Sequence, residues 1–342
     1  MERLDIGIDL GTSTVLVYLR GKGVVLEEPS VIAVNTNTGE VLAVGSEAHK
    51  MIGRTPDNIR AVRPMRDGVI SDYDATNAMI QYFIHKVCKR MLLKPRVAIC
   101  IPSGITPVES KAVIEAAMNA GVRKVYLIEE PVAAAIGAGI DISKPNGVMI
   151  VDIGGGTTDV AVISLSGIAA SDSIKIAGNR FDEAISHYIL SQHGVFIGER
   201  MSEQIKMNIG NVFHRAEDAS MEIKGRDRVT GLPAKVIITR KELLPCLLEV
   251  AEEIITAVKR VLEKTPPELA GDIKRNGIVI TGGGGLIGGL CELLTERTGI
   301  PAEHAPDPVQ CVATGTGTCF EFISSIQDGI YSPSTYNNMV GK

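Results

Sequence analysis

The sequence predicts an α/β protein built from two related halves, and three features carry that prediction. The first is a Gly-rich hairpin over 147–167, GVMIVDIGGGTTDVAVISLSG, whose first apolar strand ends in Asp152. The second is a similar hairpin near the start of the chain. The third, over 277–290, reads as a strand, four glycines and a helix. Internal repetition of the hairpin indicates two halves of one architecture.

The hairpin over 147–167 carries more glycine than a turn requires. Gly154, Gly155 and Gly156 are consecutive, and Thr157 and Thr158 follow them. Three glycines in a row leave backbone N–H groups bare and let a ligand come close. The Asp152 carboxylate would repel a lone phosphate but would hold a hydrated Mg²⁺ beside one. We therefore expect a phosphate–Mg²⁺ cradle, and the alternative is a Gly-rich hairpin without a ligand.

The hairpin over 4–23, LDIGIDLGTSTVLVYLRGKG, repeats the pattern. Its first strand ends in Asp9, and Gly11 and three small hydroxyl residues follow: Thr12, Ser13 and Thr14. The pattern is less probable to arise by chance in two hairpins than in one, so its repetition favours a ligand over a ligand-free hairpin. We expect each half to offer its loop to a single polyphosphate held between them.

Length and composition exclude several classes of protein. The 342 residues suffice for two domains with cores of their own, and 45% hydrophobic content rules out a disordered chain. A net charge of −5, a lack of Trp and 4% aromatic residues argue against nucleic-acid binding. Six scattered cysteines without a CxxC pair, and no apolar stretch long enough to span a bilayer, indicate a reduced cytosolic protein.

In the first half, the start of the chain is rich in predicted strands up to residue 44, and 45–65 is expected to be a charged, loop-like appendage. The remaining pattern predicts helices over 75–91, 108–120 and 132–138 and strands over 97–101 and 125–128. The last of these strands delivers Glu129 and Glu130 to a helix of small residues. Carboxylates are favourable at a helix N-terminus in any case. If the cradle exists, one of them is placed to orient a water for attack on a terminal phosphate.

In the second half, the patterns predict helices over 181–193 and 243–263, a hairpin over 225–238, and a helix capped by Ser202. Glu203 and Lys206 share one face of that last helix. They fit either an exposed ion pair or a polar wall for a nucleoside.

The late glycine run allows two interpretations. Gly283, Gly285 and Gly288 satisfy GxGxxG, and Glu303 lies at the distance of a ribose contact, as in a dinucleotide-binding fold. No complete set of βαβ units follows, however. We expect instead a flat backbone wall over 282–285 on which an adenine can lie. The absence of GxxxxGK[ST] excludes a P-loop.

An apolar triplet, Met91, Leu92 and Leu93, is flanked by Lys89, Arg90, Lys94 and Arg96. An exposed apolar tip ringed by cations suits an anionic membrane surface. The alternative is that the triplet caps the core at a helix–strand junction.

Several motifs together resemble the bacterial actins of the rod-shape-determining MreB/Mbl type, within the actin/Hsp70/sugar-kinase superfamily. They are GIDLGTSTVLVY, RPMRDGVISDYD, PSGIT, LIEEPVAAAIGAG, VDIGGGTTDVAVISL, GRDRVTGLP and ITGGGG, and the resemblance covers roughly residues 1–325. It implies an actin-like ATPase fold, with two RNase H-like domains around a nucleotide cleft. Domain I would hold 1–140 and about 315–342, with a small subdomain over 33–65. Domain II would hold 141–314, with a small subdomain over 181–245.

The resemblance also implies ATP and Mg²⁺ as cofactors and assigns roles to residues. Asp9 and Asp152 would hold Mg²⁺ through waters. Glu130 would orient the attacking water with help from Thr157, for which Thr158 is a competitor. The implied nucleotide-binding residues are Thr12, Ser13, Thr14, Gly154, Gly155, Gly156, Thr157, Thr158, Glu203, Gln204, Ile205, Lys206, Gly283, Gly284, Gly285 and Leu286. Two positions depart from the family pattern, since Thr14 stands where Asn is common and Gly285 where Ala is common.

The function implied is that of an ATP-hydrolysing filament protein that organises cell-wall synthesis and maintains a rod shape. It would be cytoplasmic and peripherally attached to the inner face of the cytoplasmic membrane through Met91, Leu92 and Leu93, because the first strand begins too early for an amphipathic N-terminal extension. Its partners would be itself and membrane proteins of the wall-elongation machinery, and not nucleic acid. The alternatives are a small-molecule kinase of the same fold, for which no acceptor segment is evident, and a chaperone ATPase, for which the chain ends too soon.

Overall fold

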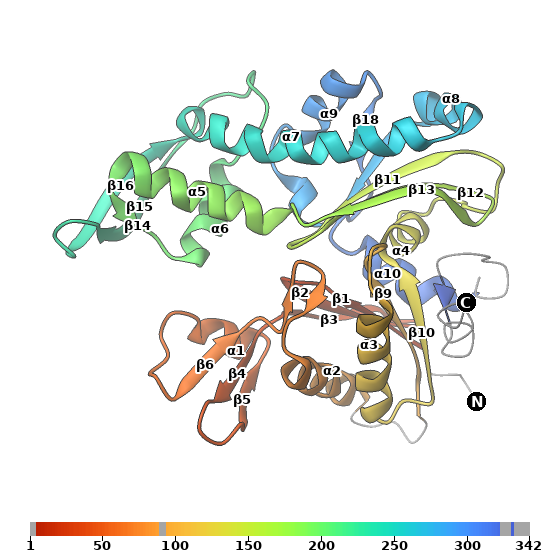
Figure 1. Ribbon diagram of the computed structural model, residues 1–342, viewed down its shortest axis with the longest axis horizontal. Coiled ribbons are helices and arrows are strands. Elements are labelled where there is room, and N and C mark those ends of the chain that lie inside the picture. The colour runs from red at the N-terminus through yellow and green to blue at the C-terminus, as the bar shows by residue number, and fades with distance from the viewer. Residues whose placement is uncertain (1–4, 89–93, 322–329, 332–342) are drawn as a thin grey trace.

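The computed structural model describes residues 5–88, 94–321 and 330–331. Figure 1 shows two lobes, each built on one large sheet. The sheet of the first lobe has the order β19-β10-β9-β1-β2-β3. Its strands are β1 (Asp5–Leu10), β2 (Thr14–Leu19), β3 (Gly23–Pro29), β9 (Arg96–Ile101), β10 (Lys124–Glu129) and β19 (Ile330–Tyr331). The helices α2 (Tyr73–Cys88) and α3 (Pro107–Asn119) pack on this sheet around Phe83 and Val113.

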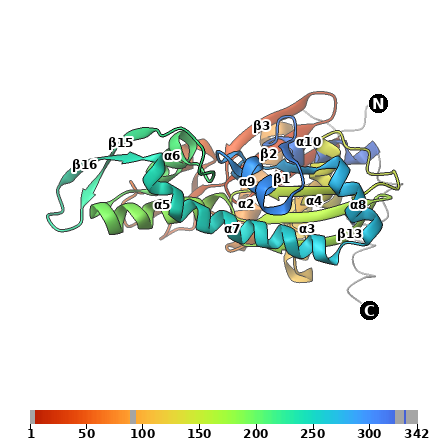
Figure 2. The same cartoon turned by 90° about the horizontal axis from the view of Figure 1, so that it is seen from above.

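The sheet of the second lobe has the order β13-β12-β11-β17-β18. Its strands are β11 (Val148–Ile153), β12 (Thr158–Ser164), β13 (Gly167–Ile174), β17 (Ile278–Thr281) and β18 (Ala302–His304). Four helices accompany it: α5 (Gly178–His193), α7 (Arg240–Lys264), α8 (Pro267–Asn276) and α9 (Leu290–Thr298). Figure 2 shows α7 running along one side of the molecule.

The two large sheets share one plan. In each, an antiparallel three-stranded meander begins with the strand whose next-to-last residue is the aspartate, and that strand also pairs in parallel with a later strand. β1 pairs with β2 and with β9, and β11 pairs with β12 and with β17. The two Asp–Gly hairpins therefore occupy matching places, and the repeat predicted from the sequence is a repeat of topology.

Smaller sheets extend each lobe. In the first lobe, β4 (Ile32–Asn35), β5 (Val41–Val44) and β6 (Ile59–Val62) accompany α1 (Ser46–Met51), beside the ribbon β7 (Met65–Arg66) and β8 (Val69–Ile70). In the second, β14 (Val195–Phe196), β15 (Ser220–Asp227) and β16 (Pro233–Thr239) accompany α6 (Glu199–Ile209). The prediction of a loop-like appendage over 45–65 is thus wrong in part. Ala48 of α1 is buried beside Val31 and Ala33, and β6 pairs with β4.

Two short helices, α4 (Glu130–Gly137) and α10 (Cys311–Thr318), pack against each other between the lobes (Figure 1). A Cβ atom on Gly137 would lie 1.8 Å from the Cys311 carbonyl oxygen, and one on Gly315 would lie 1.8 Å from that of Ala133. The small residues of the two helices therefore allow their backbones to pack closely. The core around these helices contains side chains of both large sheets, such as Ile128 and Ile150, so both lobes share it.

Several helices begin earlier than the sequence predicts, and α6 and α7 show why. α6 begins at Glu199 after the N-cap Gly198, and Ser202 lies inside the helix, buried, with no side-chain cap role. α7 begins at Arg240, because Thr239 and Glu242 form a reciprocal capping box. The helix η1 (Gly284–Leu286) follows β17, and η2 (Cys319–Glu321) follows α10. Within the described ranges, no helix combines the length and apolar character needed to cross a bilayer.

Candidate functional site

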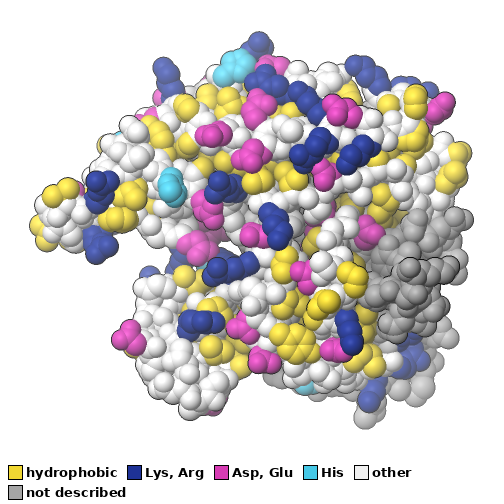
Figure 3. All heavy atoms as spheres, viewed as in Figure 1, with side chains coloured by type: hydrophobic (Ala, Val, Ile, Leu, Met, Phe, Trp, Pro, Cys, Tyr) yellow, Lys and Arg dark blue, Asp and Glu magenta, His cyan; other side chains and the backbone are white. Residues whose placement is uncertain are grey.

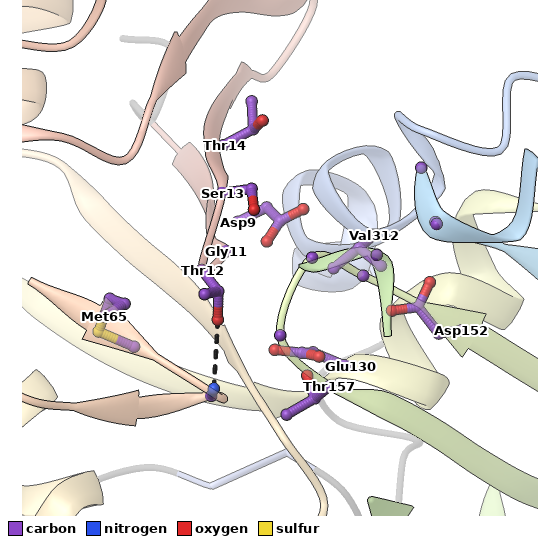
Figure 4. A pocket seen from close by; sticks show the side chains of 18 of the residues that line it. Asp9, Gly11, Thr12, Ser13, Thr14, Met65, Glu130, Asp152, Thr157 and Val312 are labelled. Atoms are coloured by element: carbon purple, nitrogen blue, oxygen red, sulfur yellow. Dashed lines mark hydrogen bonds between the residues drawn. The ribbon is translucent and has the colours of Figure 1, made fainter. Parts of the chain in front are cut away.

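A cavity of about 450 Å³ lies between the two Asp–Gly hairpins. Both hairpin loops line it, together with the start of α4, one face of α6 and the glycine turn after β17. Figure 4 shows Asp9 and Asp152 entering from the two different hairpins. A volume of this size is typical of a small-molecule or cofactor site. The shared crevice that the sequence predicts is therefore present.

The loop between β1 and β2 is held by its side-chain hydroxyls. The Thr12 Oγ1 accepts a hydrogen bond from the Gly68 backbone N–H at 3.2 Å (Figure 4). The Ser13 Oγ donates to the Asn179 Oδ1 at 3.1 Å, which joins the first lobe to the second. Thr12, Ser13 and Thr14 all line the cavity.

The loop between β11 and β12 is held by its backbone. The first N–H groups of α5, on Gly178 and Asn179, donate to the carbonyl oxygens of Gly154 and Gly155 at 3.1 and 2.8 Å. Because these carbonyls are bonded to the helix, they are not available to face an anion in the cavity. Gly154, Gly155, Gly156 and Thr157 line the cavity.

The glycines of the second loop also make room for the first loop. A Cβ atom on Gly155 would lie 2.1 Å from the Ser13 Oγ, and one on Gly156 would lie 2.6 Å from the Thr12 Oγ1. The two loops are therefore packed directly against each other, and only glycine fits where they meet.

Asp9 and Asp152 both have pKa values raised by burial. Burial raises the pKa of Asp9 to about 6, although the Cys100 thiol, 3.2 Å away, donates to its Oδ1. Burial raises the pKa of Asp152 to about 7, partly offset by the Thr281 hydroxyl, which donates to its Oδ1 at 2.6 Å. The charge of Asp159 and then that of Asp9 add to the raised pKa of Asp152, so the charge of Asp9 acts across the cavity.

Glu130 is the first residue of α4, and both it and Thr157 line the cavity. Burial, and then the charges of Asp159, Asp152 and Asp9, hold the pKa of Glu130 well above its usual range. Asp159 is fully buried, and its Oδ1 accepts a hydrogen bond from the Ser103 backbone N–H at 3.0 Å. A cluster of carboxyl groups with raised pKa values is typical of a functional site.

One end of the cavity lies between α6 and the glycine turn after β17. Glu203, Lys206 and Met207 of α6 line it on one side, and Gly283, Gly284 and Leu286 on the other. Lys206 does not pair with Glu203: its Nζ donates to Asp182 at 2.8 Å and to the Gly178 carbonyl at 2.9 Å. Glu203 thus keeps a carboxylate on the cavity wall.

Comparison with known proteins gives a consistent result. The family model described as "MreB/Mbl protein" matches residues 3–328. The cell shape-determining protein Mbl of Bacillus cereus is 52% identical over 323 residues, which cover 94% of this chain and 97% of that protein. The cell shape-determining protein MreB of Escherichia coli is 47% identical over 334 residues, with 96% of each chain covered.

The chain belongs to the MreB/Mbl family. Among solved structures, MreB5 of Spiroplasma citri bound to ADP superposes with a TM-score of 0.90 at 41% identity, over 94% of this chain and 97% of that one. The MreB/Mbl chain therefore has the actin-like ATPase fold that its motifs imply.

Four residues predicted to bind nucleotide in this MreB/Mbl protein do not line the cavity. The Thr158 hydroxyl donates to the Ile176 carbonyl at 2.6 Å, and Ile205 is buried in the core beneath α6. Gln204 is exposed on another face of α6, and Gly285 is buried behind its neighbours against Ile280. Between the two threonines, Thr157 is the one that faces the cavity. Sequence spacing alone did not separate them, because both follow the same glycine run.

The dinucleotide-fold interpretation of the late glycines is wrong. The turn after β17 forms the short 3₁₀ helix η1, and α9 begins only at Leu290, so no α-helix begins within the GxGxxG run. Glu303 lies exposed on β18, paired in register with Val279, and is absent from the cavity lining.

The cavity of the MreB/Mbl chain also contains residues that the site prediction omitted. Asn179 and Gly68 join the lining and bind the first loop, and Met65 contributes an apolar side chain (Figure 4). The motif RPMRDG, which holds Met65 and Gly68, was used for the resemblance but not for the site. The predicted membrane residues Met91, Leu92 and Leu93 lie outside the described residues.

Proposed function

We propose that this MreB/Mbl chain binds and hydrolyses ATP and polymerises into membrane-associated filaments that organise wall synthesis and maintain a rod shape. The observation that carries the proposal is the meeting of the two Asp–Gly loops across one cavity of nucleotide size. The names of the relatives add support, since they are cell shape-determining proteins and one is bound to ADP.

We assign the chain to two domains that the shared core joins. Domain I is residues 1–140 with about 315–342, and its small subdomain over 33–65 contains β4, β5 and α1. Domain II is residues 141–314, and its small subdomain over 181–245 contains α6 and the hairpin β15–β16. The matching strand orders of the two large sheets support this division.

Mg²⁺ fits the donor set of the cavity. Asp9 and Asp152 offer carboxylate oxygens, which Mg²⁺ prefers, and a cation beside them would stabilise the charged forms that burial disfavours in both. Among the described residues, no group of three or more His, Cys, Asp or Glu side chains is placed to hold a metal directly. That arrangement suits an ion that keeps its waters and is bound largely by phosphate oxygens. When bound, Mg²⁺ would supply charge neutralisation for the phosphates.

Different residues of the chain would bind the phosphates, bind the nucleoside and activate the attacking water. Backbone N–H groups of the second loop and the hydroxyls of the first would bind the phosphates from two sides. Glu203 and Lys206 would form the nucleoside wall, and Gly283, Gly284 and Leu286 the adenine side. Glu130, with Thr157 beside it, would orient the attacking water and accept its proton, because a carboxylate whose pKa is raised is a stronger base when ionised.

Filament formation follows from head-to-tail stacking, since such contacts generate open filaments when the rotation does not close. The chain is its own first partner in this proposal. The inner face of the cytoplasmic membrane and membrane proteins of the wall-elongation machinery are the others, and nucleic acid is not one of them.

Sedimentation and electron microscopy with liposomes test this function. With ATP and Mg²⁺ we expect the purified chain to pellet and to form filaments on lipid, and with EDTA to do neither. A chain that stays monomeric at micromolar concentrations on liposomes with ATP would contradict the proposal. ADP release stimulated by a sugar or a carboxylic acid would favour the alternative, a small-molecule kinase.

The membrane part has a separate test. Changing Leu92 and Leu93 to serine should weaken flotation with anionic liposomes without lowering the melting temperature, because insertion of apolar side chains is lost. Val108→Ser is a matched control, since that apolar side chain is 78% exposed on α3. Undiminished flotation of the double variant would show that the triplet does not bind the membrane.

A further inference from the structure

We propose that Arg63 and Glu199 form a latch across the mouth of the nucleotide cavity and that this latch slows nucleotide release. The inference rests on the proposed function in one respect, that a nucleotide occupies the cavity. It adds a determinant of the exchange rate that lies outside the residues assigned to binding or hydrolysis.

The latch is an ion pair between the lobes. The Nε and Nη2 of Arg63 both donate to the Oε1 of Glu199, the first at 3.0 Å. Arg63 lies between β6 and β7 in the first lobe, and Glu199 is the first residue of α6 in the second. Figure 3 shows basic and acidic side chains meeting across the gap between the lobes.

Both partners are attached to segments that line the cavity. Two residues after Arg63 comes Met65, which lines the cavity, and Gly68 follows in the same segment. Glu199 shares a face of α6 with Glu203 and Lys206, because positions four and seven residues apart recur on one side of a helix. Any movement that widens the cavity between these segments therefore pulls the ion pair apart.

The surroundings make this pair stronger than a typical surface pair. The Arg63 side chain is only 18% exposed, against 50% for Glu199. Glu199 lies in the first turn of α6, where a carboxylate also interacts favourably with the helix dipole. Burial and then the charges of Arg63 and Arg200 lower the pKa of His49 of α1, so a third element approaches the same contact.

Contacts elsewhere in the molecule hold the lobes together, so the lobes separate most at the Arg63–Glu199 pair. At the base of the cleft, α4 and α10 are locked together by glycine contacts within a core that both lobes share. Deeper in the cavity, the Ser13–Asn179 hydrogen bond joins the two loops. Opening about the fixed base separates the mouth most, and there the Arg63–Glu199 pair resists it.

The test measures dissociation of a fluorescent ATP analogue with Mg²⁺ by stopped flow, chased with excess ATP. Arg63→Gln and Glu199→Gln should each speed release about three- to tenfold, since a partly exposed ion pair contributes roughly 1 kcal/mol. The double variant should be no faster than either single variant. The charge exchange Arg63→Glu with Glu199→Arg should return the rate toward that of the wild type.

A matched control separates the latch from a general loss of charge. Arg60→Gln removes an arginine from nearby β6 whose ion pair with Asp72 stays within the first lobe, and it should leave release unchanged. Raising the KCl concentration should speed release more from the wild type than from Arg63→Gln, because salt screens the phosphate contacts in both proteins but the ion pair in the wild type alone. Melting curves check that each variant is folded.

The outcomes are distinct. If the wild type binds nucleotide and folded single variants release it at the wild-type rate, the latch is wrong and the proposed function stands. If rates rise but the charge exchange does not restore them, the pair does not act as a latch. A wild type that binds no nucleotide would overturn both proposals.

Discussion

The two Asp–Gly hairpins have the same sequence pattern and matching places in their sheets, but they are held in different ways. The first, between β1 and β2, depends on side chains, because the hydroxyls of Thr12 and Ser13 make its bonds to Gly68 and Asn179. The second, between β11 and β12, depends on backbone bonds from the start of α5. The two copies of the motif thus have the same strand pairing although different hydrogen bonds hold their loops in place.

Their aspartates differ as well. Asp152 is 4% exposed and has a pKa raised to about 7, whereas that of Asp9 is raised to about 6. Asp152 and Asp159 stand opposite each other in the register of β11 and β12. The second hairpin therefore concentrates more buried acid than the first. The acids of the second hairpin therefore influence the protonation of the site more than Asp9 does, while the first hairpin makes the side-chain contact between the lobes.

The largest expected effect concerns Glu130 of the first domain, whose pKa is raised by burial and then by the charges of Asp159 and Asp152 of the second hairpin more than by that of Asp9. Glu130→Ala should slow ATP hydrolysis about 100-fold or more and leave ATP affinity near normal, because it removes the group that orients and deprotonates water. Phosphate release and nucleotide titration measure the two quantities.

Glu130→Gln separates orientation from proton transfer, since the amide keeps hydrogen bonding without a basic group. Thr12→Val in the first loop is the comparison variant, and it should weaken affinity more than turnover. Wild-type turnover in Glu130→Ala would remove Glu130 from the mechanism.

The next effect concerns the contact between the hairpins. Gly155→Ala places a Cβ 2.1 Å from the Ser13 Oγ and should weaken nucleotide binding roughly ten- to thirtyfold, within the about 1–3 kcal/mol typical of overpacking. Adding Ser13→Gly should restore much of the affinity, because the nearest remaining atom, the Ser13 backbone N, lies 3.4 Å away. Calorimetric titration measures each affinity.

Gly154→Ala is the control, since its nearest contact is the Thr157 carbonyl oxygen at 3.4 Å. If Gly155→Ala weakens binding no more than Gly154→Ala, the loops are not packed as described.

These contacts show how far the sequence alone could go. The hairpins and their aspartates were predictable, because strand periodicity and glycine runs are local signals, whereas the choice of Glu130 over Glu129 came from the family resemblance. The roles of Asn179 and Gly68 were not, since each acts through a contact with a loop more than 50 residues away. Lys206 shows the same limit, because its spacing suggested Glu203 as a partner and the fold supplies Asp182.

The pH dependence of stability sharpens the electrostatic difference. An acid whose pKa is higher in the folded than in the unfolded chain binds more protons when folded, so stability falls as pH rises between the two values. For Asp152 that window runs from about 4 to about 7, and for Asp9 from about 4 to about 6. The slope is at most about 1.4 kcal/mol per pH unit for each group.

Urea unfolding in EDTA without nucleotide measures this slope. The free energy of unfolding should fall from pH 5 to pH 7, and Asp152→Asn should flatten the curve up to pH 7 while Asp9→Asn flattens it only up to about pH 6. Asp227→Asn is the control, because hydrogen bonds from the Thr230 backbone and hydroxyl lower the pKa of that partly exposed acid. Equal slopes in all variants would contradict the difference between the hairpins.

The smallest expected effect is the hydrogen bond that joins the hairpins' two lobes, from the Ser13 Oγ to the Asn179 Oδ1 at 3.1 Å. Ser13→Ala and Asn179→Ala should each weaken nucleotide binding a few-fold, and the double variant should cost less than the sum, with a coupling of about 0.5–1 kcal/mol. A second double-mutant cycle, with Ser30→Ala in place of Ser13→Ala, is the control and should show no coupling to Asn179→Ala. Ser30 is a buried serine of the first lobe, and its hydroxyl donates to the Met79 sulfur. Additive effects of Ser13 and Asn179 would mean that the first loop is held by Gly68 alone, and that its hydroxyls close the first lobe on itself without connecting it to the second.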